Sequence, residues 1–216
     1  ILYVSIKSFR NVFDNAKFKI KRTLFFILDW LVILPICATV ASFCFAFLFT
    51  FAQVDGDSMY PTIYNESTVF VSYLEEVEQF DIVVAYITPE DNLVSPSYGT
   101  EYYIKRVIGM PGDRVTWIKG VLTINGEVID ETYFDEITKL KFKQFFESGT
   151  EFYGEFKYKV DGVISSSYTI PDGYYFVMGD NRIGSNDSRQ IGLIPAKNIE
   201  GVVKFEISSS GIERAN

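Results

Sequence analysis

The sequence predicts a mostly β fold, in which an antiparallel, barrel-like domain follows one N-terminal transmembrane helix. Two patterns lead to this prediction. The run Ile33–Ala52 contains 20 residues without a charge, enough for a helix to cross the roughly 30 Å hydrocarbon core of a bilayer. Pro35 is expected in the first turn of this helix or at a kink. After Gln53, short runs rich in Val, Ile, Tyr and Phe alternate with turn signals, and a helical period recurs only weakly, over Asp135–Glu147.

The charges around the apolar run predict how the chain lies in a membrane. Six basic residues and one acid precede Leu24, where the apolar character begins, and Asp29 interrupts it once before the long run. Because cytoplasmic flanks carry an excess of Lys and Arg, residues 1–23 are expected in the cytoplasm, residues 24–52 in the membrane, and residues 53–216 outside. A cleavable signal would have a shorter basic region and an A-x-A site after the run, so the anchor is expected to stay uncut.

The strands of the exterior domain are predicted from runs of β-forming residues. These runs are Thr68–Tyr73, Asp81–Ile87, Glu101–Ile108, Arg114–Lys119, Val121–Ile124, Tyr174–Met178 and Gly201–Ile207. Met110-Pro111-Gly112-Asp113 suits a type II turn, and Asn125-Gly126 between two short apolar runs predicts a hairpin. The stretch Asp130–Ser167 is dense in Lys, Glu, Phe and Tyr and carries no motif of known chemistry. We interpret residues 130–167 as a possible inserted subdomain or flap.

The composition excludes several classes of site. The chain has no histidine, which rules out a Ser-His-Asp triad and every His-ligated metal site. Both cysteines, Cys37 and Cys44, lie in the apolar run and are interpreted as packing residues. From Gln53 onward, 14 Lys and Arg face 26 Asp and Glu, and this acidic balance argues against binding of nucleic acid. No metal or organic cofactor is expected.

A serine shortly after the apolar run is a candidate nucleophile. Ser58 stands in Val54-Asp55-Gly56-Asp57-Ser58-Met59-Tyr60-Pro61-Thr62, a Gly-containing turn that leaves a hydroxyl approachable and can direct backbone N–H groups at an oxyanion. Alone this signal is weak, because most serines in turns are only turn residues. A catalytic serine also needs a base, and in a chain without histidine the ordinary substitute is lysine.

Lys105 is the candidate base, since a lysine serves only when burial lowers its pKa by several units. In Tyr102-Tyr103-Ile104-Lys105-Arg106-Val107-Ile108 it shares one face of an apolar strand with Tyr103 and Val107. The alternative is a lysine at a strand edge whose charged end reaches solvent, and without Ser58 nearby that alternative is favoured.

Several ordered segments resemble the conserved boxes of bacterial type I signal peptidases, of the S26, Gram-positive-like type with a Ser/Lys dyad. They are Gly56-Asp57-Ser58-Met59-Tyr60-Pro61-Thr62, Asp81-Ile82-Val83-Val84, Tyr103-Ile104-Lys105-Arg106-Val107-Ile108-Gly109-Met110-Pro111-Gly112-Asp113, and Gly179-Asp180-Asn181-Arg182 followed by Ser185-Asn186-Asp187-Ser188-Arg189. Each segment is moderately specific, whereas the ordered set after an N-terminal anchor is strongly so. It covers most of residues 53–205 but not Asp130–Ser167.

The resemblance implies a role for each matching residue. Ser58 would be the nucleophile, and Lys105 the general base and later the acid that protonates the leaving amine. Ser185 would hydrogen-bond the lysine amine and orient it. Asp187 and Arg189 would form an ion pair that supports the site, although an ion pair at the surface would contribute little.

Other matching positions concern the shape of the site. Asp180, Asn181 and Arg182 match the loop that shapes it. The expected walls of the substrate pockets, each of which could equally be a core residue, are Val54, Met59, Ile63, Tyr103 and Ile104. The chain departs from the pattern of many relatives at Gly56, where they carry a hydroxyl residue, and at Ile183-Gly184, where Asp-Asn is usual. The oxyanion hole would then depend on the Ser58 backbone N–H and a second amide.

The resemblance implies a signal peptidase I, a serine endopeptidase of the cell membrane that acts in protein secretion. Its partners would be preprotein signal peptides and the lipid bilayer. The cleaved segment would bind extended beside residues near Val54 and Tyr103 and be cut after small residues. Neutral Lys105 would take the proton of Ser58, an acyl-enzyme would form, and water would complete hydrolysis. The protein would cross the membrane once, with its N-terminus in the cytoplasm and its catalytic domain outside.

Three alternatives stay open at this stage. A self-cleaving repressor-type peptidase shares the dyad, but it carries a DNA-binding segment in place of a membrane anchor. A signal-peptidase-like protein that assists pilus or surface-protein assembly has typically lost the Ser or the Lys, and both are present here. A role specialised for processing pilin-like substrates stays open. A tethered β-domain for adhesion leaves the ordered segments unexplained.

Overall fold

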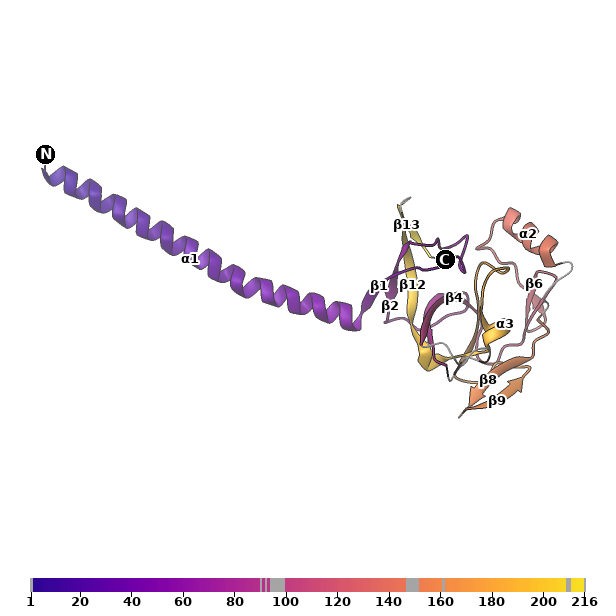
Figure 1. Cartoon of the computed structure of the whole chain (residues 1–216). Helices are drawn as coiled ribbons and strands as arrows, with labels where there is room; N and C mark the ends of the chain where they lie inside the picture. Colours follow the sequence, from indigo (N-terminus) through magenta and orange to yellow (C-terminus); the bar gives the residue numbers. More distant parts are fainter. Residues whose placement is uncertain are drawn as a thin grey trace. The chain divides into compact units, whose positions relative to one another are not determined.

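The structure is a computed structural model that describes the backbone of residues 2–89, 91, 93, 100–146, 152–160, 162–208 and 211–215. Side chains are described within these ranges from Phe18 onward, apart from Phe146. The chain divides into two compact units, Ile1–Leu48 and Phe49–Asn216. Figure 1 shows the first as a single helix and the second as a group of strands with short helices.

Helix α1 (Leu2–Phe47) includes a candidate membrane span of 30 residues, Phe18–Phe47. Pro35 lies inside the helix and not in its first turn. The predicted anchor extended to Ala52, whereas residues from Phe49 onward form a strand, β1 (Phe49–Gln53). The difference has a physical reason: aromatic and β-branched residues such as Phe49-Thr50-Phe51 are as apolar as a membrane segment but also favour strands, and here they pair with a neighbouring strand.

The main sheet has the strand order β1-β2-β12-β3-β4-β10-β11, with β13 paired to β12, and its pairings are antiparallel. Its further strands are β2 (Thr68–Ser72), β3 (Ile82–Ile87), β4 (Glu101–Gly109), β10 (Tyr174–Met178), β11 (Ile194–Pro195), β12 (Ile199–Ser208) and β13 (Gly211–Arg214). The antiparallel β prediction is confirmed for this sheet. The order is an open path that ends at β1 and β11, and the described strands form no closed barrel, so the barrel-like form stays a prediction.

Smaller elements complete the second unit. They are β5 (Val115–Ile118), β6 (Val121–Ile124), β7 (Glu127–Val128), α2 (Glu136–Phe146), β8 (Phe156–Val160), β9 (Val163–Ser167), α3 (Ser188–Ile191) and the 3-10 turn η1 (Ala196–Asn198). Both predicted turns are confirmed. Gly112 has φ 92° and Asp113 N donates to Met110 O at 3.0 Å, while Asn125 and Gly126, at φ 54° and 88°, join β6 to β7.

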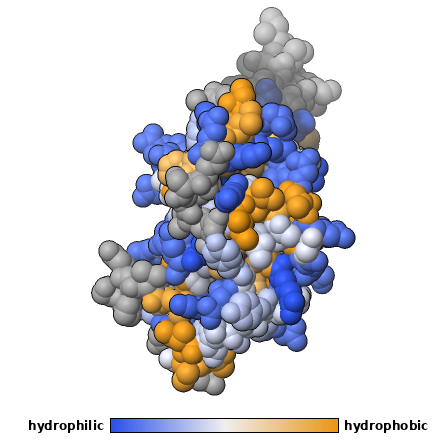
Figure 2. All heavy atoms as spheres, turned by 90° about the vertical axis from the view of Figure 1, so that its right-hand side faces the viewer, coloured by the Kyte–Doolittle hydropathy of each residue, from blue (hydrophilic) through white to orange (hydrophobic). Residues whose placement is uncertain are grey.

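Parts of residues 130–167 share a hydrophobic core with strands outside that segment. Phe134, Phe142 and Phe156 are buried in one cluster with Trp117 and Leu122 of β5 and β6. Residues 147–151 and 161 lie outside the described part of the chain. Figure 2 shows the side of the molecule where Figure 1 draws α2, β6 and the β8–β9 hairpin, and there hydrophobic patches alternate with hydrophilic side chains.

A second core lies beneath the turn that contains Ser58. Met59 and Ile63 pack there with Val69 and Val71 of β2 and with Val203 of β12. A third cluster packs against β4 through Val107, with Val83 of β3 and Val177 of β10. The turn and β4 are therefore both fixed by buried side chains, which keeps the two elements that carry Ser58 and Lys105 rigid.

Candidate active site

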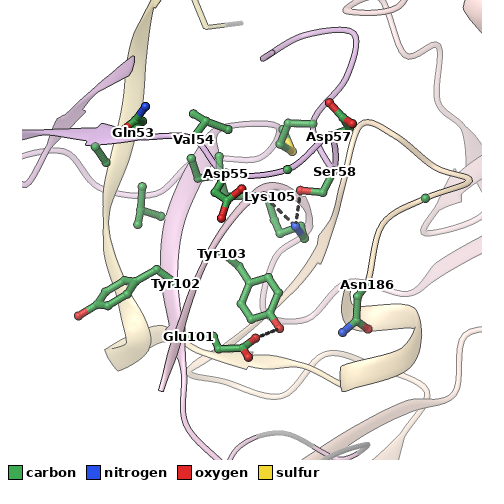
Figure 3. A pocket seen from close by; sticks show the side chains of 16 residues that line it. Gln53, Val54, Asp55, Asp57, Ser58, Glu101, Tyr102, Tyr103, Lys105 and Asn186 are labelled. Carbon is green, nitrogen blue, oxygen red and sulfur yellow. Dashed lines mark hydrogen bonds between the residues drawn. The ribbon is translucent and has the colours of Figure 1, made fainter. Parts of the chain in front are cut away.

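Ser58 and Lys105 meet although 47 positions separate them in the chain. Lys105 Nζ donates to Ser58 Oγ at 2.8 Å and to Ile104 O at 3.0 Å. Ser58 lies in the turn after β1, and Lys105 lies on β4. Figure 3 shows the two side chains pointing toward each other across one end of a cleft. The structure thus brings together the predicted nucleophile and the predicted base.

The turn around Ser58 is held by hydrogen bonds on both sides. Gly56 has φ 101°, a conformation that L side chains rarely adopt, and its N–H donates to Asn65 Oδ1 at 2.8 Å. From the other side, Asn181 donates to Ser58 O from its backbone N and to Asp57 O from Nδ2, each at 3.0 Å. The sequence placed Asn181 only in a shaping loop, whereas the structure shows that it holds the carbonyl of Ser58, the predicted nucleophile.

Lys105 is buried, with 2% of its surface exposed. Burial lowers the pKa of its amine to about 8, against the opposing effect of the negative charges of Asp187 and Asp180. Within the described residues no carboxylate forms an ion pair with Lys105. The ring of Tyr103 lies 5.2 Å from Nζ and covers one side of the amine. A lysine in these surroundings can lose its proton near neutral pH, as a general base must.

Arg106, the next residue on β4, points to the other face of the strand and has a carboxylate partner. Its Nε and Nη2 donate to the two carboxylate oxygens of Asp180 at 2.9 and 2.6 Å, and both side chains are fully buried. Nη1 donates to Phe80 O at 2.9 Å. This pair fastens the start of the loop Asp180–Arg189 to the strand that carries the base.

The same loop is held at two further points. Arg182 is buried, and its Nη2 donates to Glu131 Oε1 and to Tyr133 Oη. Asp187 accepts from Arg189 Nε and Nη2, both at 2.8 Å, so the predicted ion pair between these two residues is present. Asp187 also accepts from Gly179 N at 3.0 Å. The contribution of Glu131 and Tyr133 was not predicted, because both fall in the stretch without a recognised motif.

Ser185 lies close to the nucleophile without the hydrogen bond that the resemblance implies. Its Oγ is buried and has no hydrogen-bond partner among the described residues. A Cβ added at Gly179 would collide with Ser185 Oγ and with Ser58 O, so only glycine fits between them. The hydroxyl is therefore next to the dyad but unbonded to the lysine amine in this structure.

A cleft of about 630 Å³ opens beside the dyad. Four of the five predicted wall residues line it, namely Val54, Met59, Tyr103 and Ile104. Ile63 is instead fully buried beneath Met59 and does not line the cleft. Carboxylates of Asp55, Asp57 and Glu101 also line it, and Glu101 accepts from Tyr103 Oη at 2.5 Å (Figure 3).

One wall of the cleft is a strand edge. β10 pairs with β4 only from Arg106 to Gly109, while β3 pairs with the other side of β4 over Glu101–Arg106. Among the described strands none pairs with the first edge between Glu101 and Lys105. Among the described residues no group of three His, Cys, Asp or Glu side chains is placed to hold a metal ion.

Comparisons with known proteins identify relatives of the chain. Residues 27–208 match the model of the signal peptidase family, peptidase S26. Signal peptidase I S of Bacillus subtilis (strain 168) is 38% identical over 184 residues, covering 83% of this chain and 88% of that protein. Signal peptidase I of Streptococcus pneumoniae serotype 4 is 32% identical, covering 84% and 93%. A crystal structure of a signal peptidase I from Enterococcus faecalis V583 is 28% identical, with a TM-score of 0.39 and coverage of 59% and 97%. The chain belongs to the S26 signal peptidase family and resembles members from Gram-positive bacteria.

Proposed function

We propose that this protein is a membrane-bound serine endopeptidase that removes signal peptides from secreted preproteins after small residues, with Ser58 as nucleophile and Lys105 as general base. Membership of the signal peptidase family supports the activity. The observation that carries the mechanism is the 2.8 Å contact from Lys105 Nζ to Ser58 Oγ, made by a lysine that is buried and has a lowered pKa.

The reaction begins when neutral Lys105 Nζ accepts the proton of Ser58 Oγ, which attacks the carbonyl carbon of the scissile peptide bond. The resulting ammonium protonates the leaving amine, and the new N-terminus of the mature protein departs. Lys105 then accepts a proton from water, which attacks the acyl-enzyme. As the ester bond breaks and the signal peptide is released, Lys105 returns this proton to Ser58 Oγ. Throughout, the backbone N–H of Asn181 donates to Ser58 O and its side-chain Nδ2 donates to Asp57 O, which fixes the turn that carries Ser58.

The oxyanion is stabilised by backbone N–H groups of the turn. The Ser58 N–H donates to no acceptor within the described part of the chain and is free for this task. The Gly56 N–H is already engaged by Asn65 Oδ1, so it does not supply the second donor in this arrangement.

The substrate binds as an extended chain along the open edge of β4 between Glu101 and Lys105. Because alternate side chains of an extended peptide point the same way, the first and third residues before the cut face one wall. Val54, Met59 and Ile104 narrow that wall, which favours small residues such as alanine.

The apolar helix of residues 18–47 is the membrane anchor in this proposal. Its basic N-terminal flank, residues 1–23, lies in the cytoplasm, and the sheet domain lies outside. Enzyme and precursor would then share one membrane, which raises the concentration at which they meet.

The test is to incubate the full-length protein in detergent with a precursor that carries a signal peptide, and to sequence the new N-terminus. We expect one cut after an A-x-A type site and no cut with Ser58→Ala. A matched control is Ser166→Ala, on the β8–β9 hairpin, which should cleave normally. Cleavage that persists in Ser58→Ala, or an intact precursor with the unaltered protein, would contradict the proposal.

A further inference from the structure

A ring of polar side chains, two buried and one partly buried, joins the segment of residues 130–167 to the loop beside Ser58 and Lys105. Glu131 and Tyr133 precede α2 and lie outside the segments that resemble the signal peptidase boxes. Arg182 Nη2 donates to Glu131 Oε1 and, at 3.1 Å, to Tyr133 Oη. Tyr133 Oη donates to Glu131 Oε1 at 2.5 Å and so closes the ring. Both partners of the arginine come from one short stretch of chain.

Tyr133 contacts both arginines that fasten the loop. Its ring centroid lies 4.0 Å from Arg106 Cζ, and Arg106 holds Asp180 through two hydrogen bonds. Its hydroxyl accepts from Arg182. Burial, opposed by the positive charge of Arg182, raises the pKa of Tyr133, so the hydroxyl keeps its proton and stays a donor to Glu131.

The loop Asp180–Arg189 connects these contacts to the turn that contains Ser58. Asn181 stands between Asp180 and Arg182, and its two hydrogen bonds hold the carbonyls of Asp57 and Ser58. A movement of Arg182 would displace Asn181 and with it the turn that places Ser58 Oγ at 2.8 Å from Lys105 Nζ.

We propose that Glu131 and Tyr133 are positioning residues of the peptidase, which act through Arg182 and Asn181 to keep Ser58 within reach of Lys105. The inference rests on the proposed function and gives a role to a stretch in which the sequence offered none. Since the restraint holds the backbone of Asp57 and Ser58, beside the contact with Lys105, its loss lowers kcat more than it raises KM. A displacement of about 1 Å can slow a reaction about 100-fold.

The first test is Tyr133→Phe, which removes one hydroxyl and keeps the ring against Arg106. The protein in detergent is assayed on a signal-peptide substrate. A covalent serine reagent, allowed to react to completion, gives the concentration of reactive serines. The maximal rate divided by this concentration is kcat per reactive serine. We expect kcat per reactive serine to fall about tenfold or more, with KM within about twofold of its original value. A loss of folding alone would instead reduce the number of reactive serines.

The matched control is Tyr174→Phe. It removes another tyrosine hydroxyl from the same hydrophobic cluster, one that donates to Lys159 O at 2.7 Å and contacts neither arginine in the described structure. Its kcat per reactive serine should stay unchanged. An equal fall in both variants would show a general effect of core destabilisation and overturn the inference.

A second variant and a double-mutant cycle separate positioning from other effects. Glu131→Gln keeps the shape of the side chain but removes its charge, and should lower kcat per reactive serine in the same direction. An Asn181→Ala background loses the Nδ2 hydrogen bond to Asp57 O and keeps only the backbone bond to Ser58 O. Tyr133→Phe should therefore lower kcat less in that background than in the unaltered protein. The inference is overturned if the loss of kcat in the double variant equals the product of the two separate losses. It is also overturned if kcat is unaltered in both Tyr133→Phe and Glu131→Gln. If these variants turn over normally while Ser58→Ala is inactive, the proposed function stands and only the positioning role fails.

Discussion

The two faces of β4 each bury a basic side chain, and the two side chains have different partners. On one face Arg106, fully buried, donates two hydrogen bonds to Asp180. On the other face Lys105, 2% exposed, contacts Ser58 Oγ and Ile104 O, and no carboxylate of the described residues pairs with it. Burial is the same on both faces. The two cations differ in their partners, and the proposed mechanism assigns the structural role to Arg106 and the role of base to Lys105.

The two buried cations are expected to change the free energy of unfolding in opposite directions. A buried ion pair with satisfied hydrogen bonds is costly to break, since removal of one partner leaves the other charged and alone. A buried ammonium without a carboxylate is unfavourable in itself, and it relieves the cost by losing its proton. Lysine can do so near neutral pH, whereas arginine keeps its proton.

The largest effect is expected from Lys105→Arg, which keeps a positive charge but cannot act as a base. We expect kcat/KM for a precursor to fall by about 10³-fold or more, because general base catalysis is lost. Lys141→Arg on the exposed side of α2 serves as the control and should cleave at the original rate. Turnover of Lys105→Arg within tenfold of the original would remove Lys105 from the dyad.

A large loss of stability is expected from Arg106→Met, which leaves Asp180 buried without its partner. The free energy of unfolding should fall by about 3–5 kcal/mol. Urea unfolding of the full chain reports this through the fluorescence of Trp117, which is buried in the sheet domain, in a Trp30→Phe background. Arg106→Met combined with Asp180→Leu should recover much of the loss. An unchanged midpoint in Arg106→Met would show that the pair contributes little.

For Lys105→Met we expect the opposite of the effect of Arg106→Met, namely an increase in the free energy of unfolding at pH 7. Burial lowers the pKa of Lys105 from 10.5 to about 8, so the folded protein holds the charged form at a cost of about 3 kcal/mol at pH 7. Removing the amine should therefore raise the free energy of unfolding at pH 7, while activity is lost. The gain is complete below pH 8 and shrinks as the pH rises toward 10.5, where the unfolded chain also loses the proton.

The same fluorescence assay at pH 7 and near pH 10.5 tests this sign. Arg106→Met, measured in parallel, should lower stability at both values of pH. Destabilisation of Lys105→Met at pH 7 would mean that the amine is favourably paired in the folded protein.

A smaller effect is expected from Ser185→Ala. Its buried Oγ has no partner among the described residues, and a bond to the lysine amine would have to form during the reaction. Loss of one such hydrogen bond should lower kcat about two- to tenfold and leave KM unaltered. If kcat does not change, Ser185 fills space beside Gly179 and takes no part in catalysis.

Most strands could be predicted because their signals are local, whereas the pairing of Ser58 with Lys105 depended on the resemblance of the ordered segments. Lys105 stands in an apolar alternating run and Ser58 in a Gly-containing turn, and the ordered segments gave their pairing. β1 was missed since Phe49-Thr50-Phe51 continues an apolar run without a break. Membrane and sheet both accept such residues, and only pairing with β2 decides between them.

The ring around Arg182 could not be predicted for a different reason. Its partner Glu131 is 51 positions away, and a single acidic residue in a charged stretch gives no local sign of burial. Ile63 was placed wrongly for another reason. An apolar residue near a predicted nucleophile fits a substrate wall and a core equally well in the sequence. In the structure Ile63 packs with Met59 in the core.

In the proposed mechanism Lys105 must be neutral when it accepts the proton of Ser58 Oγ. The most direct test is the pH dependence of kcat/KM, measured with a peptide substrate that has no group titrating between pH 6 and 9. With a pKa of about 8, kcat/KM should rise about tenfold per pH unit below that value and level off above it. A profile that stays flat from pH 6 to 9 would contradict the account.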